Sequence, residues 1–152
     1  METALLAENI FGEKLYQQRA RQAFPYLVRQ AIMGETIYYS DLAKELGIPN
    51  ERNLNYVLGS IGTTLVELAE QKKESIPPIQ CLVINKATGL PGDGFGEFIS
   101  ESDFSSLDNK QKRTVVNSLL SNIYAFPRWF SILHELGLSL PNYPILMANP
   151  IN

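Results

Sequence analysis

The stretch that decides the fold is SDLAKELGIPNERNL, residues 40–54. Ser40 is a good helix N-cap, and the apolar positions after it predict a short helix over residues 41–46. Gly47 suits the end of that helix because glycine readily adopts the left-handed conformation found there. Asn50 is a second N-cap, so another helix is expected to follow at once. Two helices joined by a short turn with a glycine are typical of a helix–turn–helix.

The second helix of the pair is predicted to start at residue 51 and to continue to about residue 69. Its apolar residues recur at helical spacing: Leu54, Val57, Leu58 and Ile61. The residues at its start are polar, and in a helix–turn–helix this part of the second helix faces the base edges of the major groove. Arg52 suits guanine there, and Asn53 or Asn55 suits adenine.

The segment before the helix–turn–helix reads as helical from residue 3 to about residue 32. Pro25 suits the first position of a helix, which predicts a break near Phe24 and a new helix over residues 25–33. Gly34 follows at a position where a left-handed residue ends a helix.

The segment after the second helix predicts a small β-structure. Residues 79–85 form the most strand-like run of the chain, residues 86–89 suit a turn, and residues 90–95 form a glycine-rich return. A strand, turn and return over residues 79–98 would form the wing of a winged helix. Lys86 and Thr88 would lie at its tip, near DNA phosphates.

From residue 100 the chain is helical again. Ser106 or Asp108 is expected to cap one helix, and a short amphipathic helix follows over residues 127–136. The predicted fold class is therefore mainly α with a small β-wing (α+β), a winged helix–turn–helix core with extra N- and C-terminal helices. The expected organisation is an N-terminal helical extension, the winged helix–turn–helix, C-terminal helices packed on it and an extended tail, over residues 1–24, 25–99, 100–140 and 141–152.

The composition excludes several classes of protein. The chain has 152 residues, 13 basic and 16 acidic side chains, and a formal net charge of −3. A single cysteine, Cys81, excludes a disulfide scaffold, and with His134 it leaves too few soft ligands for a closed zinc site. The N-terminus lacks the basic and apolar regions of a signal peptide, and no run is long enough for a membrane span. A cytoplasmic protein without metal or cofactor is expected.

Residues 31–49, AIMGETIYYSDLAKELGIP, resemble the DNA-binding region of alkyltransferase-like proteins and O6-alkylguanine-DNA alkyltransferases. That family has a helix, a glycine with a Thr-Tyr strand, a second helix, a Gly-x-Pro turn and then the recognition helix. Residues 83–91, VINKATGLP, are similar to the stretch after the family's active-site loop. The resemblance covers roughly residues 26–95 and implies a winged helix that binds duplex DNA.

The chain departs from this family at the active site. The family signature, Pro-Cys/Trp-His-Arg, stands just before the Val-Asn turn, where this chain has PIQCL over residues 78–82. Cys81 is one residue out of register with the family's nucleophile. It has no basic neighbour in the sequence to lower the pKa of its thiol. We expect Cys81 to be a core residue, and we do not expect alkyl transfer.

The predicted function is that of a non-catalytic winged-helix protein that binds double-stranded DNA. The expected DNA-contacting residues lie on the second helix, on the strand before the first helix and on the wing: Tyr38, Tyr39, Ser40, Asn50, Arg52, Asn53, Asn55, Tyr56, Lys86 and Thr88. Further candidates for phosphate contacts are Lys72, Lys73, Lys110, Lys112 and Arg113.

The alternative is a protein-binding adaptor or accessory subunit, for example in a multi-component system of phage defence. The net negative charge and the apolar, proline-rich end of the chain favour that alternative, as does the scarcity of catalytic residue types. If the chain binds DNA, its charge predicts few phosphate contacts, or a partner or homodimer that supplies more of them.

Overall fold

The computed structural model describes residues 7–92 and 106–141. The chain is mainly helical, with a small two-stranded sheet, as the sequence predicts. The α-helices of the described residues are α2 (Leu15–Met33), α3 (Tyr39–Leu46), α4 (Leu54–Lys72), α6 (Asn109–Ala125) and α7 (Trp129–Glu135). Two 3₁₀ turns, η1 (Glu51–Asn53) and η2 (Ile79–Leu82), and two strands, β1 (Ile37–Tyr38) and β2 (Val83–Ile84), complete the described structure.

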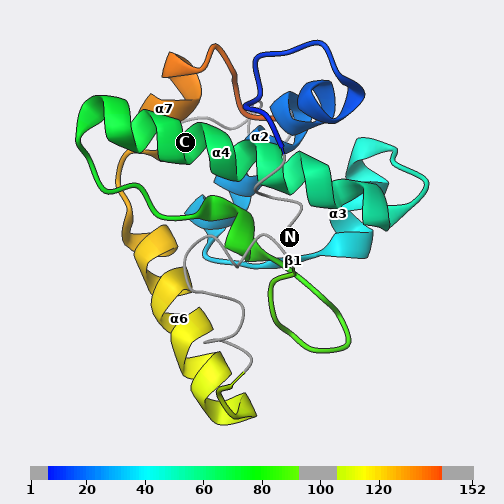
Figure 1. Cartoon of the computed structure of the whole chain (residues 1–152), viewed down its shortest axis with the longest axis vertical. Helices are drawn as coiled ribbons and strands as arrows, with labels where there is room; N and C mark the ends of the chain where they lie inside the picture. Colours follow the sequence, from blue (N-terminus) through cyan, green and yellow to red (C-terminus); the bar gives the residue numbers. More distant parts are fainter. Residues whose placement is uncertain (1–6, 93–105, 142–152) are drawn as a thin grey trace, which may run out of the picture.

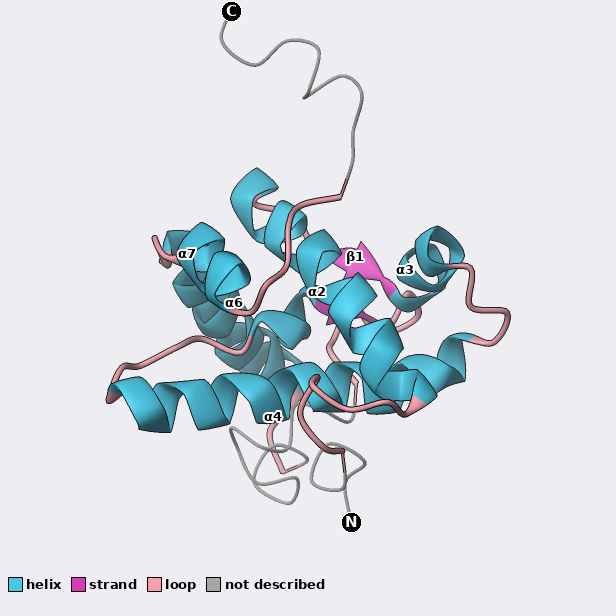
Figure 2. Ribbon diagram, turned by 90° about the horizontal axis from the view of Figure 1, so that it is seen from above, coloured by secondary structure: helices cyan, strands magenta, loops and turns pink. Residues whose placement is uncertain are grey.

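The core lies where α4 packs on α2, with η2 wedged against both helices (Figure 1). Fully buried side chains from all three elements meet there, among them Phe24, Leu27, Ile61, Ile79 and Leu82. Figure 2 shows α4 running along one side of the molecule and the small sheet beside α3 at one end. Burial of these large apolar side chains is the main stabilising contribution to the fold.

The helix break predicted at Phe24 is wrong, because α2 is continuous from Leu15 to Met33 with Pro25 inside it. A proline inside a helix removes one backbone hydrogen bond and crowds the preceding turn. Here Phe24, Pro25 and Leu27 are all buried, so packing on α4 outweighs that local cost. The predicted end of the helix is confirmed: Gly34 has φ of 71° and a left-handed conformation.

The first helix of the predicted pair begins earlier than expected. Ser40 is not its N-cap, since α3 starts at Tyr39 and Tyr38 holds the extended cap position. The pairing of β1 with β2 accounts for the shift, because it keeps the chain extended through Tyr38 and leaves Tyr39 free to begin the helix. The end at Gly47, with φ of 71°, is confirmed.

The β-structure also differs from the predicted wing. Residues 79–82 form the 3₁₀ turn η2 instead of a strand, and β2 pairs in parallel with β1, Ile37 with Val83. Burial of all four residues of η2 against the helices favours this compact turn over an extended strand. The return is present as an isolated antiparallel bridge between Ile84 and Pro91. The rest of the predicted wing, residues 93–98, lies outside the described residues.

The C-terminal helices follow the prediction closely. Asp108 caps α6, and the side chains of Asp108 and Gln111 each accept a hydrogen bond from the other's backbone N–H. In α7, Trp129 is buried and its indole N–H donates to the carbonyl of Ile123 at 2.9 Å. The neighbouring Phe130 is 56% exposed. The tail predicted beyond residue 141 lies outside the described residues.

Candidate nucleic-acid interface

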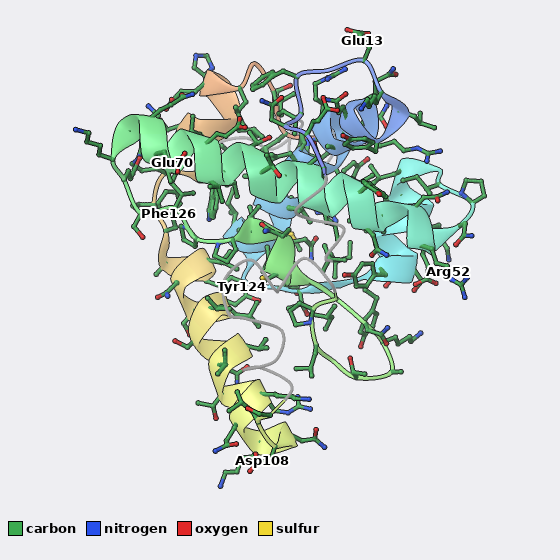
Figure 3. All side chains as sticks on the ribbon, viewed as in Figure 1. Glu13, Arg52, Glu70, Asp108, Tyr124 and Phe126 are labelled. Atoms are coloured by element: carbon green, nitrogen blue, oxygen red, sulfur yellow. The ribbon has the colours of Figure 1, made fainter. Side chains whose placement is uncertain are left out.

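The turn between α3 and α4 carries four exposed polar residues, Asn50, Glu51, Arg52 and Asn53. We call Asn50, Arg52 and Asn53 the α4-start surface. Asn50 caps η1 as predicted, since its side chain accepts a hydrogen bond from the Arg52 N–H at 3.0 Å. Leu54, the next residue, is fully buried and anchors the turn in the core. Arg52 lies at the edge of the molecule (Figure 3). The anchored turn therefore presents Arg52 and Asn53, two of the three residues predicted to read bases; the third, Asn55, is half-buried in α4.

A hollow of about 220 Å³ lies beside the α4-start surface. Its lining comes from α3, η1, α4 and the segment after β2: Tyr39, Glu51, Arg52, Asn55, Asn85 and Gly92. We call it the first hollow. It brings together three of the predicted site residues, Tyr39, Arg52 and Asn55. It also places the carboxylate of Glu51 on the same surface, which weakens its attraction for phosphates.

Residues 85–92 form a loop that is held in a defined shape. The Asn85 N–H donates to the Leu90 carbonyl at 2.8 Å, and the Gly89 N–H donates to the Asn85 carbonyl at 2.7 Å. At the end of the loop, the Gly92 N–H donates to the Tyr39 hydroxyl at 3.0 Å. A Cβ atom at Gly92 would lie 2.3 Å from that hydroxyl oxygen, so only glycine fits there without movement of Tyr39. The loop is thereby fixed to α3, next to the α4-start surface.

Beneath the first hollow lies a small space of about 10 Å³, lined by Tyr39, Asn55, Gln80, Cys81 and neighbouring residues. This space has room for about one water molecule. The Gln80 side chain is 3% exposed, and neither its amide nitrogen nor its amide oxygen has a hydrogen-bond partner among the described residues. Cys81 is 1% exposed, which confirms the prediction of a core residue.

The other predicted site residues do not line the first hollow. Tyr38 is exposed, and the Lys86 ammonium lies over its ring, 5.5 Å from the centroid. Thr88 is exposed on the loop, where its hydroxyl oxygen accepts the Leu90 N–H at 3.1 Å. Tyr56 points toward α2, where its ring lies 5.4 Å from that of Tyr16. Ser40 is half-buried in the first turn of α3 and does not line the first hollow.

A second hollow, of about 390 Å³, lies on the other side of the loop, between the loop and the first turns of α6. We call it the second hollow. Its lining residues are Ala87, Thr88, Leu90, Asn109, Lys112 and Arg113. Two of the predicted phosphate contacts, Lys112 and Arg113, are therefore placed together. Lys72 and Lys73 lie elsewhere, at the far end of α4, where Lys72 forms a salt bridge with Glu135 at 2.6 Å.

Four salt bridges are formed among the described residues, and all of them lie away from the loop of residues 85–92. They join Lys14 to Glu8, Arg29 to Glu45, Lys72 to Glu135 and Arg128 to Glu74. Arg52, Lys86 and Arg113 form no salt bridge within residues 7–92 and 106–141. Across the same residues there is no group of three or more potential metal ligands, and no helix is long and apolar enough to cross a membrane.

Sequence reasoning missed Gln80, Asn85 and Gly92. Gln80 stands in an apolar run that predicts a strand, and nothing local indicates that its amide is buried beside Asn55. The sequence predicts Asn85 at the end of that strand and Gly92 in a return, with no specific contact for either residue. The Asn85-to-Gly89 turn motif is the one local signal that points to a structured loop.

Comparisons with protein families, with curated proteins and with solved structures find no match to this chain.

Proposed function

We propose that this protein binds double-stranded DNA without catalysis, through a winged helix–turn–helix formed by α3, α4 and the loop after β2. The observation that carries the proposal is the exposure of Arg52 and Asn53 in η1, directly before α4, whose first residue, Leu54, is fully buried. This arrangement presents guanidinium and amide groups on a rigid support, which direct base reading requires.

The loop supplies the flank that such an interface needs. Lys86 and Thr88 are exposed on it, and the Tyr39–Gly92 hydrogen bond fixes it beside the start of α4. Within a helix–turn–helix, α3 would cross the DNA backbone while the start of α4 enters the major groove. The loop would then lie along the adjacent phosphates, as a wing does.

Local charge supports this proposal in spite of the net charge of −3. Three basic side chains around the loop, Arg52, Lys86 and Arg113, form no salt bridge within the part of the chain that the structure describes. Basic groups whose charge is not already neutralised are the ones that release counterions when they meet DNA phosphates.

The second candidate is a protein-binding adaptor or accessory subunit. A groove of about 470 Å³ between α2, the end of α3 and residues 137–141 favours it. Apolar parts of its lining come from Pro25, Tyr26, Leu46, Leu138 and Pro141. This groove is separate from the α4-start surface, so the two candidates predict different sensitive residues.

The test is a DNA-binding titration with a short labelled duplex of mixed sequence at low salt. The double variant Arg52→Ala with Asn53→Ala should weaken binding by ~10-fold or more, because contacts of this kind contribute about 1–3 kcal/mol each. Lys73→Gly is the matched control. It removes one positive charge at the far end of α4, and glycine fits the left-handed conformation of that residue, φ 51°.

Unchanged affinity of the double variant would remove the α4-start surface from the interface. If the unmodified protein does not bind duplex DNA, the proposal is overturned and the alternative function, a protein-binding adaptor, is favoured. Thermal melts monitored by circular dichroism show whether each variant is folded, and both substituted residues are exposed.

A further inference from the structure

We infer that the second hollow is a phosphate-binding site that holds a backbone phosphate of the same duplex that meets the α4-start surface. The inference rests on the proposed function and adds a contact from α6, a helix that lies outside the helix–turn–helix. It extends the DNA path across the loop, from Arg52 on one side to Lys112 and Arg113 on the other.

The lining of the second hollow has the chemistry of an anion site. Lys112 and Arg113 bring two positive charges from α6, and Asn109 adds an amide N–H₂ donor. Across the hollow, the Thr88 hydroxyl accepts a backbone N–H through its oxygen, so its own proton is left to donate to an anion. None of the six described lining residues is acidic, in contrast to the first hollow with Glu51.

The loop allows Arg113 to approach closely. Gly89 has φ of 71°, and a Cβ atom built on it would lie 3.9 Å from the Arg113 Nη1. The Arg113 guanidinium group therefore lies close to Gly89, the residue that follows Thr88 in the loop. A guanidinium presents its N–H donors in a planar fork that matches two oxygens of a phosphate.

The start of α6 does not itself supply this site. Asp108 and Gln111 form a capping box that already satisfies two backbone N–H groups there, and the Asp108 carboxylate would repel an anion placed on the helix axis. Figure 3 shows Asp108 at the free end of α6. The affinity for an anion therefore has to come from the side chains of Lys112, Arg113, Asn109 and Thr88.

The arrangement of the two hollows favours DNA over an isolated phosphate compound or an acidic protein. Both hollows share the loop as a common wall: Asn85 and Gly92 line the first, and residues 87, 88 and 90 line the second. A polymer with regularly repeated phosphates can occupy both sides of such a loop at once. We expect each side to contribute separately to the salt dependence of binding.

The test compares the double variant Lys112→Gln with Arg113→Gln against a control with the same loss of charge. The control is Lys72→Gln with Lys73→Gly, at the far end of α4. Affinity for the short mixed-sequence duplex is measured between about 50 and 200 mM salt. The Lys112/Arg113 variant should bind ~10-fold more weakly at the lower salt. Its negative slope of log affinity against log salt should become shallower by about 2, one for each lost phosphate contact. The control should change neither by a comparable amount.

The outcomes separate this inference from the proposed function. Full affinity and an unchanged salt slope in the Lys112/Arg113 variant, with loss in the Arg52/Asn53 variant, would overturn the phosphate site and leave the proposed function standing. An equal loss in the Lys72/Lys73 control would also overturn it, because total charge would then be the cause. Loss in the Lys112/Arg113 variant alone would support the phosphate site and overturn base reading by the start of α4. An absence of any duplex binding by the parent would overturn both.

Discussion

The two ends of α4 differ in how their charged residues are used. At the C-terminal end, Lys72 pairs with Glu135 at 2.6 Å, and the Arg128 guanidinium donates to both carboxylate oxygens of Glu74 at 2.7 and 2.6 Å. At the other end, Arg52 and Glu51 are exposed and form no salt bridge with any described residue. Figure 3 shows the separation, with Glu70 toward one end of the helix and Arg52 beyond the other.

Under the proposed function, the two ends of α4 have different roles. The paired charges connect the C-terminal end of α4 to the region of α7 and orient the two, although exposed ion pairs add little stability. The unpaired charges at the start remain available to a ligand. The buried middle of the helix, from Leu54 to Leu65, supports both ends.

The largest effect is expected from a change in that shared middle. Ile61→Ala should lower the free energy of unfolding by about 2–5 kcal/mol, because Ile61 is fully buried and its truncation leaves a cavity. Urea unfolding measures the loss. DNA binding by the fraction that stays folded should be normal, since Ile61 lies on neither hollow. A loss below about 1 kcal/mol would contradict the packing of α4 on α2 described above.

A smaller effect of opposite sign is expected beneath the first hollow. Gln80→Met keeps a side chain of similar length and removes a buried amide that has no described partner. We expect a gain of about 1–3 kcal/mol, the cost of leaving such a group unpaired. Urea unfolding is again the measurement.

A matched control for the Gln80 variant is Ser60→Ala, since the Ser60 hydroxyl is also buried without a described partner. Both variants should shift the unfolding midpoint in the same direction. Loss of stability in Gln80→Met alone would mean that a water molecule in the 10 Å³ space satisfies the amide.

The features predicted correctly are those that depend on a few neighbouring residues. Gly34 and Gly47 end helices, and Asn50 and Asp108 cap them, because each motif satisfies backbone groups within one turn. The Asn50 cap predicts Arg52 in the first turn of the second helix, whereas the structure has Arg52 in η1, directly before α4. Most of the α4-start surface could therefore be predicted, although not the 3₁₀ turn that carries it.

The features that sequence reasoning missed depend on contacts between distant segments. Pro25 stays inside α2 because the helix packs on α4, and Ile37 pairs with Val83 across 46 residues. Residues 79–82 form a turn because both helices bury them, although their apolar pattern suits a strand equally well. The second hollow needs the loop and α6 together, which no local pattern reveals.

The smallest effect is expected at the C-terminal end of α4, where acid should weaken the Glu74–Arg128 pair. The hydrogen bonds from Arg128 hold the pKa of Glu74 below its ordinary value of 4.5. A carboxylate with a lowered pKa in the folded state adds stability above its unfolded pKa, and that stability is lost as the pH falls through the folded pKa.

Arg128→Gln should therefore lower the melting temperature slightly at neutral pH, and the difference from the parent should shrink below about pH 4.5. Thermal melts from pH 7 to pH 3 measure this convergence. Glu74→Gln should show the same convergence, because it removes the titrating group itself. A difference that stays constant down to pH 3 would show that the pair is not what links this end of α4 to the α7 region. Duplex affinity at neutral pH should match the parent in both variants, since the start of α4 does not depend on this pair.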